Sequence, residues 1–245
     1  PARVNPLPGF ESLSLHHSIP SINMIINYKA ILFGSIGTLV ETSELQRQAF
    51  NKAFSDAGLD WNWNSKDYQH MLSKSGGCNR IQDFATRYGI DVDAKKLHQQ
   101  KTKIFDSLMS REAISLRPGV ASLISYALDN GLLLAFVTNT SEANINVVFH
   151  ALKNQIKRSD FSFIGNDMIA SNPKPNPEIY LKALSGIHLK AKDCIAIEDT
   201  EISMQAALAA EIRCIGFPGE FSKNNSFTGA SLVTDNLSTN YLVNL

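Results

Sequence analysis

Short apolar runs alternate with amphipathic stretches along most of the chain from residue 24 onward. Each run ends in glycine or polar residues, and between most runs apolar residues recur at the spacing of a helix. Strands that alternate with helices in this way form a parallel sheet with helices on both faces. The runs that we interpret as strands lie at residues 28–33, 132–137, 161–164, 194–197, 213–217 and 231–233.

The stretch between the first two strands has a different pattern. It is polar and mostly helical in its periodicity, and several glycines interrupt it. We therefore predict a helical unit over 41–113, inserted into a core that consists of 24–40 and 114–245. Residues 1–23 are rich in proline and are predicted to be a surface extension.

Composition narrows the class of protein. Of 245 residues, 44% are hydrophobic and 19% are charged, which excludes a mainly disordered chain. Lys and Arg total 23, as do Asp and Glu, so no overall charge favours nucleic acid or an anionic membrane surface. No apolar run approaches the roughly 18 residues that a membrane span needs. Cys78, Cys194 and Cys214 are far apart and form no zinc or disulfide pattern. We expect a soluble, intracellular protein with no nucleic-acid or membrane partner, in an oligomeric state that the sequence leaves open.

Polar side chains follow several of the predicted strands directly. Ligands of open parallel sheets bind beyond the carboxyl ends of the strands. Thr138 and Asn139 stand there at a helix start, which favours an anion, and Lys174 in a proline-rich loop adds a positive charge. Glu198 and Asp199 carry oxygen ligands for a divalent cation. Taken singly, these groups also fit a helix cap, a solvated loop lysine and a charged first helical turn. Their shared position indicates a phosphate site.

The order of these residues resembles the haloacid dehalogenase-like superfamily, in its CbbY-like and beta-phosphoglucomutase-like branch. The resemblance implies a Rossmann-like, doubly wound α/β core with an inserted α-helical cap domain, and phosphatase chemistry on sugar phosphates with Mg²⁺. It extends from about residue 28 to the C-terminus. The segments that carry it are ILFGSIGTLVET (31–42), LSKSGGCNRI (72–81), LRPGVASLI (116–124), VTNTSEAN (137–144), NPKPNPEIY (172–180) and AIEDTEISMQAALAA (196–210).

The first motif departs from the family pattern D-x-D-G-T/V. In the family, the first Asp attacks phosphorus and the second acts as general acid and base. Gly34 holds the nucleophile position here and Ile36 the acid/base position, whereas Gly37 and Thr38 match. Neither replacement can perform its step, and the loss of a nucleophile costs turnover a factor on the order of ten thousand or more. The standard mechanism is therefore expected to be absent.

The resemblance also implies what the rest of the site retains. Glu198 and Asp199 correspond to Mg²⁺ ligands, and because other carboxylates are lost we expect weak or no Mg²⁺ binding. Lys174 is then expected to pair directly with a carboxylate. The phosphate-binding residues that the resemblance implies are Thr38, Thr138, Asn139 and Lys174.

In the cap, the family pattern is G-G-K-x-R-I. Gly77 and Arg80 match it, Cys78 replaces the Lys, and Arg117 matches a further arginine of the substrate pocket. Ser35 lies beside the lost nucleophile, but strand alternation predicts that its side chain points away from the pocket. Three functions stay open. They are an impaired phosphatase-like protein that binds a phosphorylated metabolite, an active phosphatase or phosphotransferase with another nucleophile, and a structural or partner-binding protein with a collapsed pocket.

Overall fold

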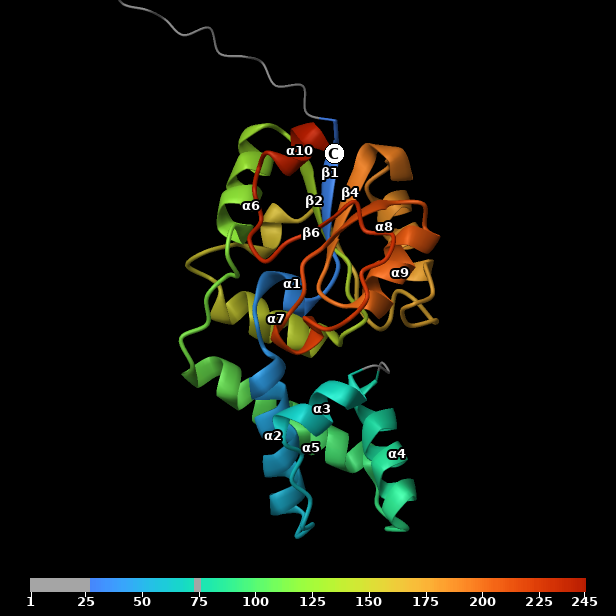
Figure 1. Ribbon diagram of the computed structural model, residues 1–245. Helices are drawn as coiled ribbons and strands as arrows, with labels where there is room; N and C mark the ends of the chain where they lie inside the picture. Colours follow the sequence, from blue (N-terminus) through green and yellow to red (C-terminus); the bar gives the residue numbers. More distant parts are fainter. Residues whose placement is uncertain (1–26, 73–75) are drawn as a thin grey trace, which may run out of the picture.

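The computed structural model describes residues 27–72 and 76–245, so the predicted extension over 1–23 lies outside the described residues. The described chain contains a six-stranded sheet of order β3-β2-β1-β4-β5-β6, in which all neighbours pair in parallel (Figure 1). This confirms the predicted α/β fold with a doubly wound parallel sheet. The strands are β1 (Ala30–Phe33), β2 (Leu133–Phe136), β3 (Phe163–Ile164), β4 (Cys194–Glu198), β5 (Arg213–Gly216) and β6 (Leu232–Val233).

Two apolar clusters cover the two faces of this sheet. Side chains alternate between the faces of a strand, so Ile31 and Phe33 of β1 pack toward one cluster and Ala30 and Leu32 toward the other. The helices of this sheet body are α1 (Ile36–Leu39), α6 (Val120–Asp129), α7 (Glu142–Ala151), α8 (Glu178–Gly186), α9 (Glu201–Ala209) and α10 (Tyr241–Asn244), with short 3-10 turns η1 (Arg158–Asp160), η2 (Ala191–Asp193) and η3 (Glu220–Ser222). Helices α6, α7 and α10 contribute to the first cluster, and α8 and α9 contribute to the second.

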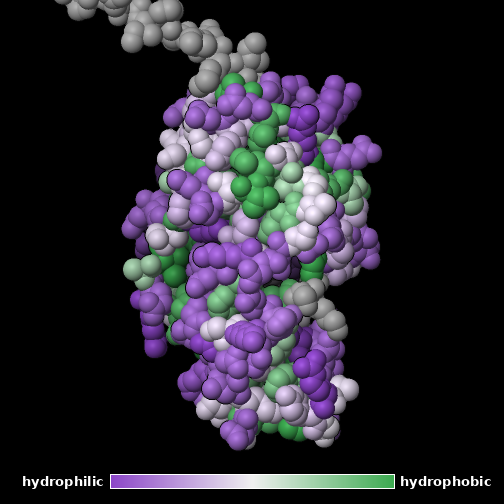
Figure 2. Space-filling view, in the orientation of Figure 1, coloured by the Kyte–Doolittle hydropathy of each residue, from purple (hydrophilic) through white to green (hydrophobic). Residues whose placement is uncertain are grey.

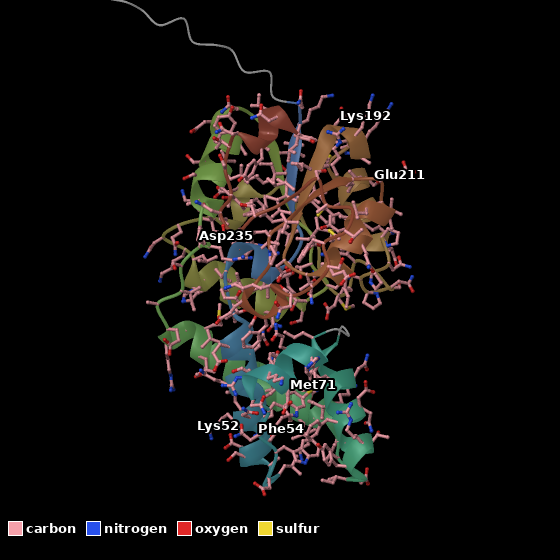
Figure 3. All side chains as sticks on the ribbon, in the orientation of Figure 1. Lys52, Phe54, Met71, Lys192, Glu211 and Asp235 are labelled. Carbon is pink, nitrogen blue, oxygen red and sulfur yellow. The ribbon has the colours of Figure 1, made fainter. Side chains whose placement is uncertain are left out.

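The remaining helices form a separate helical body below the sheet in Figure 1. Its core is aromatic: Phe50 and Phe54, one turn apart on one helix, pack against Trp63 with ring centroids 4.9 and 4.7 Å away. Figure 3 shows Phe54 among the helices and Lys52 at the outer side, as an amphipathic helix requires. The helices are α2 (Ser43–Asp56), α3 (Ser65–Met71), α4 (Gly77–Tyr88) and α5 (Ala94–Arg111).

The two bodies are joined by the segments between α1 and α2 and between α5 and α6. They also meet through side chains, since the ring of Phe221 from η3 lies 5.9 Å from the ring of Tyr68 on α3. Figure 2 shows mainly hydrophilic side chains over this face of the molecule. No helix in the described part of the chain has both the length and the apolar character that crossing a bilayer requires.

The register of the strands explains where a site can form. Phe33 at the end of β1 pairs with Phe136 of β2 and with Ile197 of β4. The segments that follow these three strands therefore start at the same edge of the sheet. The chain crosses from one side of β1 to the other between β3 and β4, so this edge is also the point where strand order reverses.

Candidate functional site

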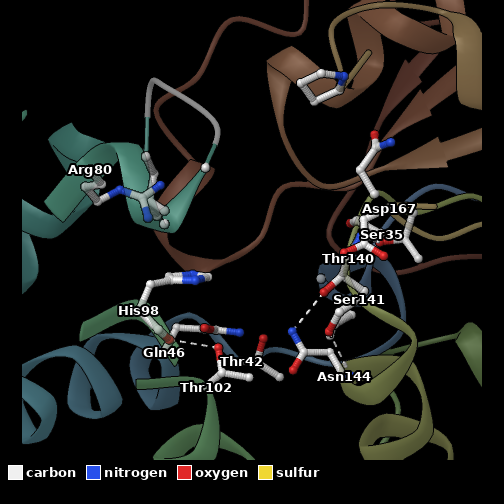
Figure 4. Close-up of a pocket in the computed structure, with 18 of the residues that line it drawn as sticks. Ser35, Thr42, Gln46, Arg80, His98, Thr102, Thr140, Ser141, Asn144 and Asp167 are labelled. Atoms are coloured by element: carbon white, nitrogen blue, oxygen red, sulfur yellow. Dashed lines mark hydrogen bonds between the residues drawn. The ribbon is translucent and has the colours of Figure 1, made fainter. Parts of the chain in front are cut away.

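A cavity of about 1050 Å³ lies between the sheet body and the helical body. Its upper wall comes from the residues that follow β1, β2 and β4, and its lower wall comes from α2, α4 and α5. Figure 4 shows Ser35, Thr140 and Asp167 on one side of this space and Arg80 and His98 on the other. An open space of this size is inconsistent with the collapsed pocket that we kept as an alternative.

Lys174 and Glu198 form a buried ion pair at the sheet wall. Lys174 Nζ lies 2.6 Å from Glu198 Oε1, and the hydroxyl of Tyr180 donates to the same oxygen at 2.6 Å. The ammonium group also donates to the carbonyl oxygens of Gly34 and of Val137, the latter at 2.8 Å. The side chain of Glu198 is 0% exposed. The direct pairing of Lys174 with a carboxylate that we expected is therefore present.

Burial and charge act in opposite directions on this carboxyl group. Burial raises the pKa of Glu198 to about 7, although the positive charge of Lys174 lowers it. Glu198 Oε2 is buried and has no hydrogen-bond partner among the described residues. One oxygen of the carboxylate is thus fully used inside the protein, while the other is enclosed without a donor.

The carboxylate groups of Glu198 and Asp199 occupy the space that side chains at positions 34 and 37 would need. A Cβ built on Gly34 would overlap the carboxylate of Glu198, and a Cβ built on Gly37 would overlap the carboxylate of Asp199. Position 34 therefore lacks a nucleophile, and the space beside it is already filled. Ile36, at the acid/base position, is 9% exposed and belongs to a hydrophobic cluster.

Ser35 contradicts the sequence-based expectation. Its hydroxyl donates to Asp199 Oδ1 at 2.5 Å, and it lines the cavity instead of pointing away from it. The alternation rule fails because β1 ends at Phe33 and Ser35 is already the N-cap of α1. Burial raises the pKa of Asp199, while the hydrogen bond from Ser35 opposes this rise.

The predicted phosphate-binding residues have different positions. Thr138 and Asn139 line the cavity, where Thr138 Oγ1 accepts from the backbone N–H of Thr140 at 3.2 Å and Asn139 Oδ1 accepts from the backbone N–H of Lys174 at 3.2 Å. Thr38 is fully buried and is not among the residues that line the cavity. Its hydroxyl donates to the carbonyl of Ser35 at 2.7 Å, so Thr38 holds the turn.

Arg117 also differs from its predicted place in the substrate pocket. Its guanidinium donates to the carbonyl oxygens of Gly37, Phe217 and Pro218 at 2.7, 2.9 and 2.6 Å. It lies 3.5 Å from the centroid of the Phe217 ring and is not among the cavity-lining residues. These contacts join the turn that follows β1 to the segment that follows β5, so the role of Arg117 in this structure is structural.

Gly77 and Arg80 line the cavity from the helical body. A Cβ on Gly77 would overlap the imidazole of His98, so the helices approach closely here. Arg80 Nε donates to the carbonyl of Met71 at 3.1 Å, and its guanidinium lies 5.5 Å from the ring centroid of Tyr68. Burial lowers the pKa values of Arg80 and His98.

Lys101 is a cavity residue that the sequence analysis missed. It is 5% exposed and lies on α5, with Nζ 4.8 Å from the Phe50 ring centroid and 4.9 Å from that of Phe105. The ammonium group donates to Gln46 Oε1. Burial, and next the positive charge of Arg80, lower the pKa of Lys101 to about 7. The available signal was a lysine within the apolar stripe formed by Ala94, Leu97, Phe105 and Met109.

The sheet wall offers few ligands for Mg²⁺, which prefers near-octahedral oxygen coordination. Its acidic side chains are Asp167, Glu198 and Asp199, and one oxygen of Glu198 is taken by Lys174 and Tyr180. Within residues 27–72 and 76–245 no group of three or more His, Cys, Asp and Glu side chains is arranged to hold a metal ion.

The model of the haloacid dehalogenase-like hydrolase family matches residues 31–217. Protein CbbY of Cereibacter sphaeroides is 36% identical over 210 residues, which cover 84% of this chain and 91% of that protein. A CBBY-like protein of Arabidopsis thaliana is 29% identical over 218 residues, covering 84% of this chain and 68% of that protein.

Solved structures give the same grouping. The crystal structure of CbbY from Rhodobacter sphaeroides in complex with phosphate has a TM-score of 0.82 and 34% identity, and covers 89% of this chain and 100% of that chain. A mutant of that protein in complex with xylulose-(1,5)bisphosphate has a TM-score of 0.80 and 36% identity, with coverage of 85% and 94%. A beta-phosphoglucomutase from Clostridium difficile, at 21% identity and a TM-score of 0.71 over 88% and 95%, shares the fold.

Proposed function

The chain belongs to the haloacid dehalogenase-like hydrolase family, in its CbbY-like branch, and we propose that it binds a small phosphorylated metabolite without hydrolysing it by the family's mechanism. The observation that carries this proposal is the relationship between Gly34 and Glu198. Position 34 has no side chain to attack phosphorus, and the carboxylate of Glu198 extends into the space where one would lie. Ile36 has no group that exchanges a proton. Both steps of the covalent mechanism therefore lack their reacting atoms.

The proposal includes weak or absent Mg²⁺ binding. An intact metal site would place a divalent cation among several carboxylates, whereas Lys174 already neutralises Glu198 here. A bound metal would have to displace the ammonium group or bind with Asp199 alone. Mg²⁺ gives up its water ligands reluctantly, so Asp199 alone would be a weak anchor for it.

A sugar phosphate is the ligand class that we propose. CbbY from Rhodobacter sphaeroides has been crystallised with phosphate, and a mutant of it with xylulose-(1,5)bisphosphate. In this chain, the cavity of about 1050 Å³ has room for a molecule of that size and is lined by hydroxyl, amide and cationic side chains. These two observations support binding of a related metabolite.

A thermal-shift series with sugar monophosphates and bisphosphates, each with and without Mg²⁺, tests this function together with a phosphate-release assay. Because a ligand that binds only the folded state stabilises it by RT ln(1 + [L]/Kd), we expect at least one phosphate ester to raise the Tm. The assay should show no release of phosphate above that of the heat-inactivated protein. A flat Tm for every ester would contradict the binding function.

A second candidate function has one specific observation in its favour. The hydroxyl of Ser35 donates to Asp199 Oδ1 at 2.5 Å and lines the cavity, which is the arrangement of a nucleophile and its base. In this alternative, Ser35 Oγ bonds to phosphorus, its proton passes to Asp199, and the bond from phosphorus to the leaving alcohol breaks. Asp199 returns the proton to the alcohol, and water then hydrolyses the phosphoserine to serine and phosphate.

The two candidates differ in what happens at Ser35. The alternative requires a phosphate ester on this residue, visible by mass spectrometry after incubation with substrate, and a loss of turnover in Ser35→Ala. The proposed binding function requires that no phosphoserine forms and that Ser35→Ala still binds the phosphate ester. Ser35→Thr, which keeps a hydroxyl, is the matched variant for both measurements.

A further inference from the structure

Lys101 is a buried amine that faces the cavity. It lies on α5, is 5% exposed and belongs to the residues that line the cavity. The rings of Phe50 and Phe105 have their centroids 4.8 and 4.9 Å from Nζ. Among the described residues no carboxylate lies within ion-pair distance of this nitrogen. The amino group has therefore lost most of its contact with water without gaining an ionic partner.

The charged groups around Lys101 act on it in opposite directions. Arg80 of α4 adds positive charge, and Asp106 of α5 adds negative charge with a smaller effect. Burial lowers the pKa of His98, one turn earlier on α5, so this imidazole adds little charge at neutral pH. Burial first, and then Arg80, lower the pKa of Lys101 to about 7. At pH 7 about half of the Lys101 side chains are then neutral amines, roughly a thousandfold more than for an ordinary lysine.

A neutral amine on the wall of a cavity is a nucleophile toward carbonyl carbon. Lysine is activated for this reaction by a hydrophobic pocket or by another cation nearby. Lys101 meets both conditions, through the two phenylalanine rings and through Arg80. Gln46 Oε1 accepts a hydrogen bond from Nζ, which holds the nitrogen at the wall and leaves the lone pair of the neutral amine unused. Figure 4 shows Gln46 and His98 on this side of the cavity.

We propose that Lys101 is a carbonyl-reactive site, at which the open-chain form of a phosphorylated sugar is held as an imine. The neutral amine attacks the carbonyl carbon, and the electron pair of the C=O double bond moves to the oxygen. The oxygen takes both hydrogens of the amine and leaves as water, so a C=N bond replaces the C=O bond. The step needs no oxidant or reductant, and water reverses it. The inference rests on the proposed binding function and narrows the ligand to a sugar phosphate with a free carbonyl group.

The chemistry of sugar phosphates narrows the ligand further. An aldopentose 5-phosphate closes into a ring that hides its carbonyl group. In a ketopentose 5-phosphate the phosphate blocks the oxygen that would close a five-membered ring, so the ketone stays open. The ring faces of Phe50 and Phe105 also attract the positive charge of a protonated imine. We therefore expect a ketose monophosphate such as ribulose 5-phosphate to be preferred to a polyol phosphate of the same length.

Reductive trapping tests the site. The purified chain is incubated with ribulose 5-phosphate and sodium cyanoborohydride, which reduces an imine to a stable secondary amine, and the modified lysine is located by peptide mass spectrometry. We expect the adduct to form at Lys101 at least about tenfold faster than at Lys96, because the neutral amine is far more abundant at Lys101. Lys96 is exposed on the same helix and does not line the cavity. Lys101→Arg, which keeps the positive charge but forms no imine, should lose the adduct, and the matched control Lys96→Arg should keep it.

Ribitol 5-phosphate, which has the phosphate and hydroxyl groups but no carbonyl, separates this site from the binding function. We expect ribulose 5-phosphate to raise the Tm more than ribitol 5-phosphate does, and Lys101→Arg to remove the difference. If both esters raise the Tm equally and no adduct forms at Lys101 above the level at Lys96, the imine site is overturned and the binding function stands. If neither ester raises the Tm but glyceraldehyde, which has no phosphate, is trapped at Lys101, the reactive amine stands and the binding function fails. Lys101→Gln, checked for folding by circular dichroism, repeats the comparison with a neutral side chain.

Discussion

Lys174 Nζ lies 2.6 Å from Glu198 Oε1 beneath the cavity floor, and it holds that carboxylate against the backbone at Gly34. The pair supplies inside the protein the charge neutralisation that a metal ion would otherwise bring. It also depends on the absence of a side chain at position 34. The loss of the nucleophile and the internal ion pair are therefore parts of one arrangement.

Gly34→Ala tests that dependence. The new Cβ overlaps a carboxylate that is buried and bonded to Lys174 and Tyr180, so it cannot move without breaking those bonds. We expect the free energy of unfolding to fall by about 1–3 kcal/mol, as is usual for overpacking. In a double-mutant cycle measured by urea denaturation, Glu198→Ala should recover part of this loss. Equal effects of Gly34→Ala in both backgrounds would show that the two sites are independent.

Lys101→Met should stabilise the protein by an amount that depends on pH. Burial lowers the pKa of Lys101 from its ordinary value of 10.5 to about 7, so the unfolded chain binds more protons than the folded one between these values. The folded state therefore bears the full penalty below pH 7 and loses it as the pH rises toward 10.5. We expect Lys101→Met to have a higher Tm than the native chain at pH 6, with the difference shrinking above pH 8. The same Tm difference at every pH would contradict a buried, titrating lysine.

Arg117→Lys distinguishes a structural brace from a substrate residue. Lysine keeps the charge but loses the forked donors that bind three carbonyl oxygens at once. We expect a loss of about 1–3 kcal/mol in the free energy of unfolding, with little change in the Kd of the phosphate ester. A higher Kd for the phosphate ester with an unchanged free energy of unfolding would instead indicate that Arg117 contacts the substrate.

Restoring the two acidic residues of the first motif tests whether their loss accounts for the weak Mg²⁺ binding that we propose. Gly34→Asp with Ile36→Asp adds two carboxylates beside Glu198 and Asp199, so we expect a lower Tm than the native chain without metal. Mg²⁺ should raise the Tm of the double variant by several degrees and leave that of the native chain unchanged. Ca²⁺ and Zn²⁺ are the comparison ions, and a native chain that responds to Mg²⁺ as the double variant does would refute weak metal binding.

The sequence predicted the architecture well because apolar periodicity and turn residues are local signals. β1, β2, β4 and β5 were found because each is buried and bounded by polar turns. The pairing of Lys174 with a carboxylate followed from counting the charges of the site that the family resemblance implies, with its two lost carboxylates removed. The sequence did not predict the direction of individual side chains at positions just beyond the end of a strand.

Ser35 and Arg117 illustrate that limit. Ser35 turns toward Asp199 because a helix starts immediately after the strand, and Arg117 finds carbonyl oxygens from a segment about a hundred residues away. Lys101 was overlooked because its helix is polar overall, although its place in the apolar stripe of that helix was a local signal of burial. The contacts of Ser35 and Arg117, by contrast, involve distant parts of the chain that no short window of sequence contains.

The most direct test of the central claim is phosphate release from a panel of sugar monophosphates and bisphosphates by the purified chain with Mg²⁺, run beside Lys174→Met, which reveals any contaminating phosphatase. We predict no release above background and no difference between the two proteins. Robust release by the native chain that disappears in Lys174→Met would contradict the account.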